Sequence, residues 1–504
     1  MAILFGIFQW LAGAYGSDLG GDPDEAAHAV TSLMVRDYIA QGISQSPLKF
    51  AEAYYTAWPK VALGHYPPGY YVVAATALGL RCDPAALIIL QAVLAAGLGL
   101  VVFHAAVGRV GVWAAALAAL LVAMLPEVVR TGSHVLSDLQ VALLMMIAVM
   151  LWRRFLQQPS WKWALAFGGA AAFAILTKAS AVSLAALPVG TVILTRRWDL
   201  VRRLAWWGSA APVVLIAGPW MVLSTRYTAE GLARTTPAEF FVEAIHYYGE
   251  AIPRVLGWGT VFLLFLAMAS EVRRQLAGAR MESLRACLWT MLVATQLLMM
   301  VVPTGFSPRY VLPWWPAAVL LGVDAIFALP VNSRLRLPAW MGVVAWIWVS
   351  CLPIKTKHVS GFGTSVARVM HEPKLSNGGN WLVSSDPRGE GAVISAAAFA
   401  GGDRCSGGFR ILRGSKELAS SDWIGRDYEL KFASDEALLA HLKENRVGWV
   451  FVDFSMPGEY LKAHETTLNT ALTSPNSGWK LAWRQEVMRS DTGAGEMLVY
   501  QREP

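Results

Sequence analysis

Residues 85–107 have the sequence Ala85-Ala-Leu-Ile-Ile-Leu-Gln-Ala-Val-Leu-Ala-Ala-Gly-Leu-Gly-Leu-Val-Val-Phe-His-Ala-Ala-Val107. The run contains no Asp, Glu, Lys or Arg, and it is longer than the roughly 20 apolar residues that a helix needs to cross a bilayer. Because the hydrocarbon core offers no water to the backbone, a segment that crosses it must satisfy its own N–H and C=O groups, as a helix does. The stretch therefore predicts a membrane protein built from helices.

Further apolar runs lie on both sides of this stretch. The N-terminal run, from Ile3 to about Tyr15, has no basic region before it, so we expect an uncleaved first helix, with a cleaved signal peptide as the alternative. Thr177-Lys178 interrupt the run 163–194, which is too long for one span and indicates a hairpin of two short helices, whereas residues 69–80 are too few to cross. The other expected spans lie near 110–126, 136–152, 204–224, 255–271, 285–303, 310–330 and 338–353. We expect a polytopic α-helical membrane protein with about eleven transmembrane helices.

Charge separates the chain into two parts. Of its 504 residues, 55% are hydrophobic and 15% are charged, against about 25% charged in a soluble domain. From Lys355 to the end, Lys and Arg balance Asp and Glu, so the whole net charge of +7 lies in the apolar part. Excess Lys and Arg beside membrane spans orient a protein and can also bind lipid phosphates. This distribution excludes an ordinary soluble enzyme, and we expect no nucleic-acid partner.

Arginine clusters assign sides to the loops. Lys and Arg gather in cytoplasmic loops, so we expect the clusters at 153–154, 196–197, 202–203, 273–274 and 334–336 on the inner side. That arrangement leaves residues 17–84, Lys178, the 225–254 loop, Arg309 and everything after residue 353 on the outer side. We therefore expect a membrane module of residues 1–353, with a first outer loop at 17–68, and an extracytoplasmic domain of residues 354–504.

Residues 354–504 alternate short apolar strands with helical patterns. Segments 381–385, 391–395, 448–453 and 497–500 indicate strands. Ser434 is followed by two acidic residues and by apolar residues at helical spacing, which indicates a helix capped by Ser434. We therefore expect a soluble α/β domain, and none of its strands is followed by a Gly-rich nucleotide-binding sequence.

The first outer loop carries two adjacent carboxylates. It opens with Gly21-Asp-Pro-Asp-Glu-Ala-Ala-His28, directly after the first expected helix. Asp24 and Glu25 could accept a proton from a hydroxyl group, or bind a metal or a cationic group. The alternative is structural: Asp22 and Asp24 cap a surface helix, and Glu25 lies in its favourable first turn. The loop ends with Gly64-His-Tyr-Pro-Pro-Gly-Tyr-Tyr71, whose prolines and tyrosines suit a membrane boundary, either in a site or as an anchor.

Four regions of the chain, taken in order, resemble a known family of membrane enzymes. They are the loop with Asp24-Glu25 and Tyr66-Pro-Pro-Gly-Tyr-Tyr71, then Arg130-Thr-Gly-Ser-His-Val-Leu-Ser-Asp138, Leu176-Thr-Lys178-Ala, and Arg309-Tyr-Val-Leu-Pro313. Across most of residues 1–330 they resemble the polytopic glycosyltransferases of the GT-C superfamily, which include the protein O-mannosyltransferases and the lipid A aminoarabinose transferases. The chain departs from many members at Tyr66, where they have Lys, so His65 or Lys60 would have to supply that contact.

The resemblance implies transfer of a sugar from a dolichyl- or polyprenyl-phosphate donor to a hydroxyl acceptor on the outer, periplasmic face, with inversion. Asp24 would be the general base, and Glu25 would orient the hydroxyl or hold the acceptor. The leaving lipid phosphate needs fixed cations. The candidates for this contact on the expected outer side are Lys60, His65, Arg130, Lys178, Arg226, Arg254 and Arg309.

Further candidates each have a structural alternative. Asp138 is either a site residue or a helix cap, and Tyr66 belongs either to the site or to the membrane boundary. Glu243 and His246 lie one helical turn apart in an outer loop that could close over an acceptor, although His246 could equally be structural. We expect no certain cofactor: Asp24, Asp138 and a histidine could bind a divalent metal, but no spacing requires one.

Two other classes of function stay open at this point. A transporter or lipid flippase would also be basic and polytopic, but it predicts paired halves with charged sites near the middle of the membrane. A non-catalytic assembly protein would keep the fold and tolerate loss of Asp24. We expect an integral protein of a bacterial inner membrane, whose partners are the lipid-linked sugar donor, membrane lipids and a glycan, lipid or protein acceptor.

Overall fold

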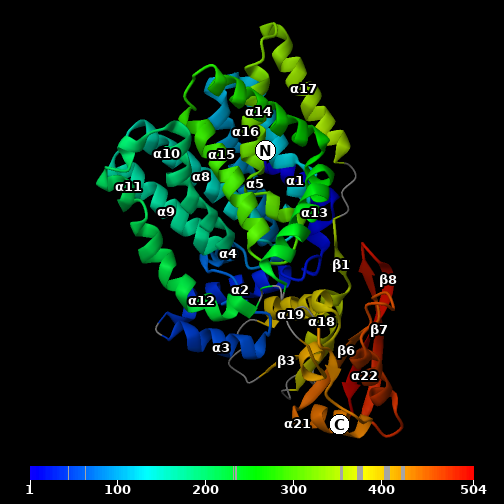
Figure 1. Ribbon diagram of the computed structural model, residues 1–504. Coiled ribbons are helices and arrows are strands. Elements are labelled where there is room, and N and C mark those ends of the chain that lie inside the picture. The colour runs from blue at the N-terminus through cyan, green and yellow to red at the C-terminus, as the bar shows by residue number, and fades with distance from the viewer. Residues whose placement is uncertain are drawn as a thin grey trace.

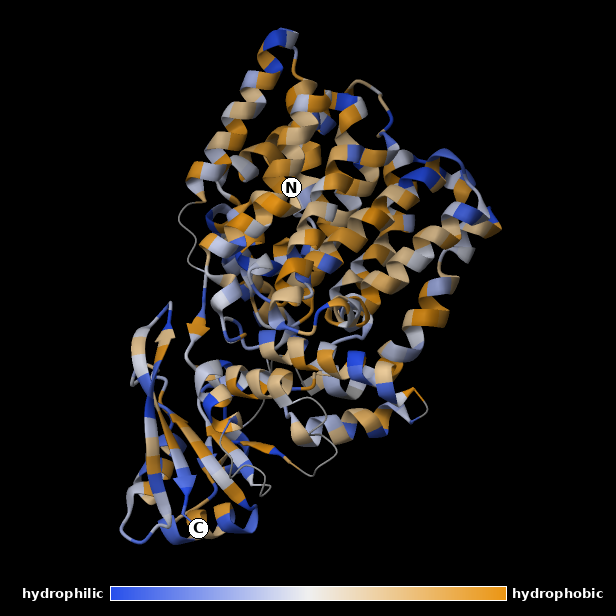
Figure 2. Cartoon of the chain, turned by 180° about the vertical axis from the view of Figure 1, so that it is seen from behind, coloured by the Kyte–Doolittle hydropathy of each residue, from blue (hydrophilic) through white to orange (hydrophobic). Residues whose placement is uncertain are grey.

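The computed structural model describes residues 1–43, 45–62, 64–230, 232, 235–351, 356–371, 379–401, 409–421 and 426–503, except the side chains of Arg226 and Glu230. Figure 1 shows a bundle of helices beside a smaller domain that contains a sheet, with α2 and α3 at the end of the bundle that faces this domain. In Figure 2, hydrophobic residues predominate throughout the bundle, whereas polar and apolar residues are mixed in the smaller domain. A mostly helical, apolar part and a C-terminal domain with a sheet are therefore visible in the structure, and the expected boundary at residue 353 stays a prediction.

The bundle and the first outer loop are built from helices. The α-helices are α1 (Ala2–Leu11), α2 (Glu25–Asp37), α3 (Pro47–Ala57), α4 (Gly69–Leu80), α5 (Pro84–Val110), α6 (Val112–Met124), α7 (Pro126–Gly132), α8 (Asp138–Gln157), α9 (Trp161–Thr177), α10 (Ala186–Thr195), α11 (Leu204–Gly208), α12 (Gly218–Glu230), α13 (Pro237–Leu256), α14 (Trp258–Leu276), α15 (Ser283–Val301), α16 (Trp315–Phe327) and α17 (Ser333–Ser350). Short 3₁₀ and π segments join them: η1 (Ala14–Gly16), η2 (Tyr38–Gly42), η3 (Ala179–Ala185), η4 (Trp198–Leu200), η5 (Val213–Ala217) and η6 (Pro308–Val311).

Several of these helices are long and apolar enough to cross a membrane. Among the described residues four qualify, at 84–110, 138–157, 204–225 and 283–301, and up to six qualify if two bent helix pairs each count as one span. The bent pairs are α6 with α7, at 50°, and α13 with α14, at 106°. The protein is thus an integral membrane protein, and the total of about eleven crossings stays a prediction.

The expected break at Thr177-Lys178 is confirmed. Helix α9 ends at Thr177, and Lys178 has an extended backbone with φ −153° and ψ 129° before η3 begins. The chain therefore leaves the regular helix at the position where a charged residue lies between two apolar segments. The chain turns at Lys178, and the Lys178 side chain is directed towards neighbouring helices.

The C-terminal domain contains a mixed sheet of six strands in the order β1-β7-β8-β6-β2-β3. Strand β2 runs parallel to β3 and β6, and the remaining pairs in this sheet are antiparallel. The elements of the domain, in chain order, are β1 (Val359–Ser360), α18 (Phe362–Met370), β2 (Asn380–Ser384), α19 (Pro387–Gly401), β3 (Ile411–Arg413), α20 (Gly414–Glu417), β4 (Ala419–Ser420), β5 (Glu429–Leu430), α21 (Asp435–Glu444), β6 (Val447–Asp453), α22 (Ala463–Thr473), β7 (Trp479–Arg489) and β8 (Gly493–Arg502).

One expected strand of this domain is wrong. Segment 391–395 lies inside α19, although the strands expected at 381–385, 448–453 and 497–500 and the helix capped by Ser434 are present. Asp386 accepts a hydrogen bond from the Gly389 N–H at 2.8 Å, and Pro387 occupies the first helical position, which together start a helix. Parallel strands β2 and β3 also require a crossover, which α19 provides.

The apolar interior is divided in an unexpected way. One core lies inside the helical bundle. A second core joins the first outer loop and α4 to the C-terminal domain, with Val30, Leu33 and Tyr71 packed in the same cluster as Val393 and Phe451. A third core covers the other face of the sheet. The first outer loop therefore packs against both α4 of the membrane module and the C-terminal domain, within one shared core.

Candidate active site

Asp24 lies at the start of α2 and binds an arginine from the other end of the module. The Arg309 Nη2 group donates to Asp24 Oδ2 at 2.6 Å, and Nη1 donates to Asp22 Oδ2 at 3.2 Å. The Asp24 side chain makes no capping hydrogen bond to α2, so the structural alternative of a helix cap does not describe it. Instead, the carboxylate is directed towards η6, the short segment that carries Arg309.

A second carboxylate and a second cation complete the cluster. Asp138 is the first residue of α8 and is 2% exposed. Lys178 Nζ donates to its Oδ1 at 2.7 Å, and Arg309 Nε lies 3.9 Å from its Oδ2. Lys178 also lies over the ring of Tyr310, 4.8 Å from the ring centroid. Three carboxylates, counting Asp22, thus share two cations, and the cluster has a formal surplus of one negative charge.

Tyr66 and His28 surround the Asp24 carboxylate on the side of the loop. The Tyr66 side chain hydrogen-bonds Asp24, and its ring lies 4.7 Å from the ring of His28. His28 Nδ1 is 3.2 Å from the hydroxyl of Tyr71. Burial lowers the pKa of His28 to about 4, although Asp24 acts in the opposite direction, so the ring is neutral near pH 7.

The Asp24 carboxylate itself is ionised. Burial alone would raise its pKa, but the charge of Arg309, a contribution from His28, and hydrogen bonds from Arg309 and Tyr66 together hold the pKa of Asp24 below its usual range. A carboxylate held in this way accepts hydrogen bonds well, and it becomes a stronger base if Arg309 moves away.

Glu25 is adjacent to Asp24 but has a different environment. It is 1% exposed, and its carboxylate accepts the N–H of Gly21 at 3.0 Å and the N–H of Val135 at 3.1 Å. Burial raises the pKa of Glu25. Its oxygens therefore tie the turn before α2 to the segment that leads into α8, and the carboxylate faces backbone groups of the protein interior.

The other expected phosphate contacts lie outside this cluster. Arg130 Nε donates to Glu127 Oε2 at 2.8 Å, within α7. His65 is exposed, with its ring 6.0 Å from that of Tyr227. Lys60 is 8% exposed and donates from Nζ to the carbonyl oxygen of Pro387 in the C-terminal domain at 2.9 Å.

The candidates of the 225–254 loop lie on a helix. Glu243, His246 and Arg254 are all exposed on α13, while the side chain of Arg226 lies outside the described part of the chain. On the packed face of α13, Tyr247 stacks on Phe306 with ring centroids 4.9 Å apart. Helix α13 therefore contacts the segment just before Arg309 and presents the other candidates to the surroundings.

Comparisons with known proteins give a family match for one segment of the chain and a similar fold for most of it. The profile of the dolichyl-phosphate-mannose-protein mannosyltransferase family matches residues 58–230. The apo structure of ArnT from Cupriavidus metallidurans aligns with 99% of this chain and 97% of its own, at 16% identity and a TM-score of 0.54. The Archaeoglobus fulgidus oligosaccharyltransferase tethered to an acceptor peptide aligns with 87% of this chain and 66% of its own, at 10% identity and a TM-score of 0.52. Residues 58–230 are thus similar to this mannosyltransferase family, and the fold of the chain is similar to that of ArnT and of the oligosaccharyltransferase.

Two further comparisons concern a second ArnT structure and curated protein sequences. A structure of the same ArnT bound to undecaprenyl phosphate aligns with 79% of this chain and 75% of its own, at 19% identity and a TM-score of 0.45. A comparison with curated protein sequences gives no significant match. The likeness to known proteins therefore rests on the family profile and on the fold.

Beside the cluster of Asp24, Asp138, Lys178 and Arg309 lies one residue that the sequence analysis did not single out for chemistry. His28 lies four residues after Asp24, so both occupy the same face of α2. This spacing is the feature of the sequence that could have identified His28. Among the described residues, no three His, Cys, Asp or Glu side chains form a metal-ligand set. Arg309 and Lys178 occupy the space between the carboxylates that a metal would need.

Lys60 is buried and leads to a prediction about pH. Burial, with Arg413 acting in the same direction, lowers the pKa of Lys60 from 10.5 to about 7. The folded protein then binds fewer protons than the unfolded one between these values, so folding stability rises as pH increases through this range. We expect Lys60→Met to raise the thermal unfolding midpoint near pH 7 and to lose this advantage towards pH about 10.

The measurement is the unfolding midpoint of purified protein as a function of pH. Lys480→Met is the control, because Lys480 is exposed on β7 of the same domain. If the curves of wild type and Lys60→Met run parallel over this range, Lys60 does not titrate in the folded protein as expected.

Proposed function

We propose that the chain is a membrane glycosyltransferase that moves a sugar from a polyprenyl-phosphate donor to a hydroxyl group, with inversion, on the outer face of a bacterial inner membrane. The observation that carries the proposal is the cluster of Asp24, Asp138, Lys178 and Arg309, which come from four separate segments. The match of residues 58–230 to a family named for dolichyl-phosphate-mannose supports a lipid-phosphate donor. Two carboxylates beside two cations suit a reaction that removes a proton and releases a phosphate.

Asp24 is the general base of the proposed reaction. The acceptor hydroxyl oxygen forms a bond to the anomeric carbon while the bond from that carbon to the phosphate oxygen breaks. The hydroxyl proton passes to Asp24, and the electron pair of the broken bond stays on the phosphate. Attack from the side opposite the phosphate inverts the configuration. The phosphate gains negative charge, which Arg309 and Lys178 stabilise.

Arg309 couples donor binding to the strength of this base. Its guanidinium binds Asp24 and Asp22. A donor phosphate competes with these carboxylates for the same N–H groups. When the phosphate takes Arg309, Asp24 loses the charge that lowers its pKa and becomes a better proton acceptor. The hydroxyl is therefore activated once the donor is in place.

The remaining candidates receive supporting roles in the proposal. Glu25 holds the turn that carries Asp24, and Tyr66 orients the Asp24 carboxylate. Arg130, Lys60 and His65 contribute positive charge or hydrogen bonds around the path of the phosphate. Exposed residues of α13, Glu243 and His246, contact the acceptor. The C-terminal domain lies on the same outer side.

Mass spectrometry of a deletion strain tests the function. We expect a sugar-charged polyprenyl phosphate to accumulate and one surface glycan, glycolipid or glycoprotein to lose a sugar, and the wild-type gene should restore both. The missing sugar would identify the substrate. If purified protein in vesicles moves the lipid across the bilayer and transfers no sugar, the transporter alternative replaces the proposal.

The proposed orientation makes a separate prediction. Alkaline phosphatase folds into an active enzyme only in an oxidising compartment, because it needs disulfides. We expect a fusion after residue 503 to be active and fusions after Gln157 and after Leu276, at the ends of α8 and α14, to be inactive. An inactive fusion after residue 503 together with an active one after Gln157 would reverse the orientation.

A further inference from the structure

The segment just before the Asp22–Asp24 turn is bound by the C-terminal domain. The Asp18 N–H donates to the carbonyl oxygen of Val359 at 2.8 Å. Its carboxylate accepts the N–H of Gly363 at 3.1 Å and also those of Phe362 and Gly361. These are N–H groups at the start of α18, which have no partners within the helix. A carboxylate of the first outer loop thus caps a helix of the other domain.

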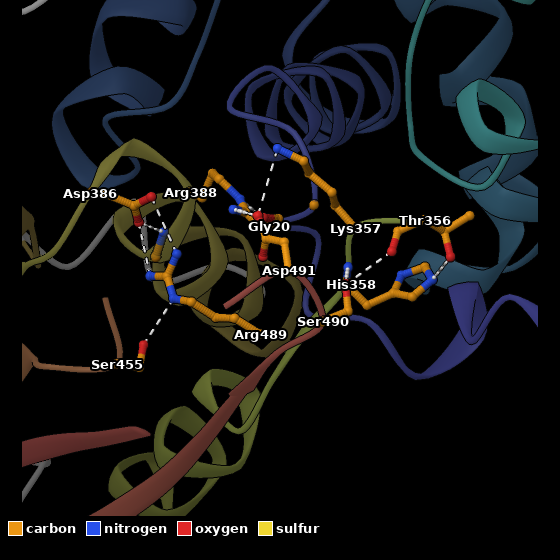
Figure 3. A network of polar contacts seen from close by, with 12 residues as sticks. Gly20, Thr356, Lys357, His358, Asp386, Arg388, Ser455, Arg489, Ser490 and Asp491 are labelled. Atoms are coloured by element: carbon orange, nitrogen blue, oxygen red, sulfur yellow. Dashed lines mark hydrogen bonds and ion pairs between the residues drawn. The ribbon is translucent and has the colours of Figure 1, made fainter. Parts of the chain in front are cut away.

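Arg388 makes a second connection to the first outer loop, at Gly20, two residues after Asp18. Arg388 lies in the first turn of α19, and its Nε donates to the carbonyl oxygen of Gly20 at 2.8 Å. Its two Nη groups bind Asp491, between β7 and β8, at 2.7 and 3.2 Å. Figure 3 shows the Arg388 side chain between Gly20 and Asp491. The planar guanidinium therefore hydrogen-bonds the first outer loop and the β7–β8 hairpin at the same time.

The approach at positions 20 and 21 is too close for any other residue. A Cβ atom at Gly20 would lie 2.5 Å from Cγ2 of Val359. A Cβ atom at Gly21 would lie 2.2 Å from the carbonyl oxygen of Lys357 and 2.4 Å from Nε2 of His134. His134 itself bridges the two parts, since its Nε2 is 2.8 Å from that same carbonyl oxygen.

Helix α2 is enclosed on the same side. It packs between α4 of the membrane module and α19 of the C-terminal domain. A Cβ atom at Gly391 in α19 would lie 2.9 Å from Cβ of Ala26, so the two helices are in close contact directly after Asp24. Residues on both sides of Asp24 are therefore fixed by groups of the C-terminal domain.

We propose that the C-terminal domain positions the carboxylate turn of the transfer site, and that Arg388 and Asp18 are the positioning residues. This inference rests on the proposed transferase function. Neither side chain touches the Asp24–Arg309 pair. Each acts through the backbone of residues 18–21, which determines where the Asp24 carboxylate lies relative to η6. A shift of about 1 Å in a reacting group can cost a hundredfold in rate.

Two measurements on Arg388→Ala and Asp18→Ala test the proposal. We expect hydrogen–deuterium exchange of the backbone amides of residues 18–25 to become faster. We also expect kcat to fall by about ten- to a hundredfold, with an unchanged KM for the donor, because Arg309 and Lys178 lie on other elements. Arg388→Lys keeps the charge with a single donor group, so it should recover part of kcat.

Matched controls separate positioning from general damage to the domain. Arg484→Ala removes an Arg–carboxylate pair with Glu496 on the β7–β8 hairpin, and Ser434→Ala removes the cap of α21. Both should leave kcat and the exchange of residues 18–25 unchanged.

Each outcome decides one question. Unchanged exchange in Arg388→Ala and Asp18→Ala would overturn the proposal, and so would faster exchange with an unchanged kcat. If the wild-type protein transfers no sugar, the proposed function fails, and the exchange measurement still decides whether the C-terminal domain holds the turn.

Discussion

Asp24→Asn is expected to lower kcat by about 10²- to 10⁴-fold, the range that a positioned general base contributes. Asparagine keeps the shape of the side chain and can still accept a hydrogen bond from Arg309, but it cannot take the hydroxyl proton. The KM for the donor should stay the same or fall, because the neutral amide competes less strongly with the phosphate for Arg309. Steady-state transfer with purified protein in lipid nanodiscs measures both constants.

The control for this variant is Asp199→Asn. Asp199 is also paired with an arginine, Arg197, at 2.7 Å, but the pair is half-exposed at the end opposite to the proposed site. Because the lowered pKa of Asp24 means that its ionised form stabilises the folded protein, we expect a lower unfolding midpoint in Asp24→Asn, and kcat is compared at a temperature at which both proteins are folded. A variant with wild-type kcat would show that Asp24 is not the base and that its ion pair is structural.

Loss of the Arg309 guanidinium is expected to have the second large effect. Arg309→Gln should lower kcat/KM for the donor by about 10²- to 10³-fold, comparable to removal of one fixed donor from a site that stabilises a developing anion. Arg309→Lys should recover only part of this loss, because an ammonium group lacks the planar fork through which a guanidinium binds a phosphate with two parallel hydrogen bonds. Arg197→Gln is the matched control on the exposed pair.

The pH profile of the same variant adds a test of mechanism. Arg309 lowers the pKa of Asp24, so its removal raises that pKa. The base acts in its ionised form, and activity is lost as the pH falls through the pKa. The acid limb of the kcat/KM profile should therefore move to higher pH in Arg309→Gln. An acid limb at its wild-type position, together with a normal unfolding midpoint, would show that the limb reports a group other than Asp24.

The central charged residues of the site could be predicted because each lies in a short local pattern of the sequence. Asp24 follows the first helix, Asp138 begins an apolar helix, and Lys178 interrupts one, so each is a charge at a boundary of an apolar run. The family resemblance placed these boundaries in one site, and Arg309 joins them in the structure. A charge at a membrane boundary is costly to bury alone, which limits the arrangements that such residues can adopt.

The partners of two other candidates differ in how far away they lie in the sequence. Lys60 donates to the carbonyl oxygen of Pro387 in the C-terminal domain, whereas Arg130 binds Glu127, three residues earlier in its own helix. The spacing of Glu127 and Arg130 is a local helical pattern, but no local pattern identifies Pro387 as the partner of Lys60. Segment 391–395 has the apolar character of a strand, yet the crossover between β2 and β3 requires a helix there.

The core shared by the first outer loop and the C-terminal domain also governs biosynthesis. The loop leaves the ribosome early, but its apolar partners in the C-terminal domain extend from Val359 to Val499. At about 5–20 residues per second, the loop waits from roughly fifteen seconds to a minute and a half for them. During that interval the side of the loop that packs on the C-terminal domain has no covering, and the contacts of Asp18 and Gly20 with that domain cannot form. A chain cut short within the membrane module never makes these contacts, so we expect the proposed transferase activity only from chains that contain the C-terminal domain.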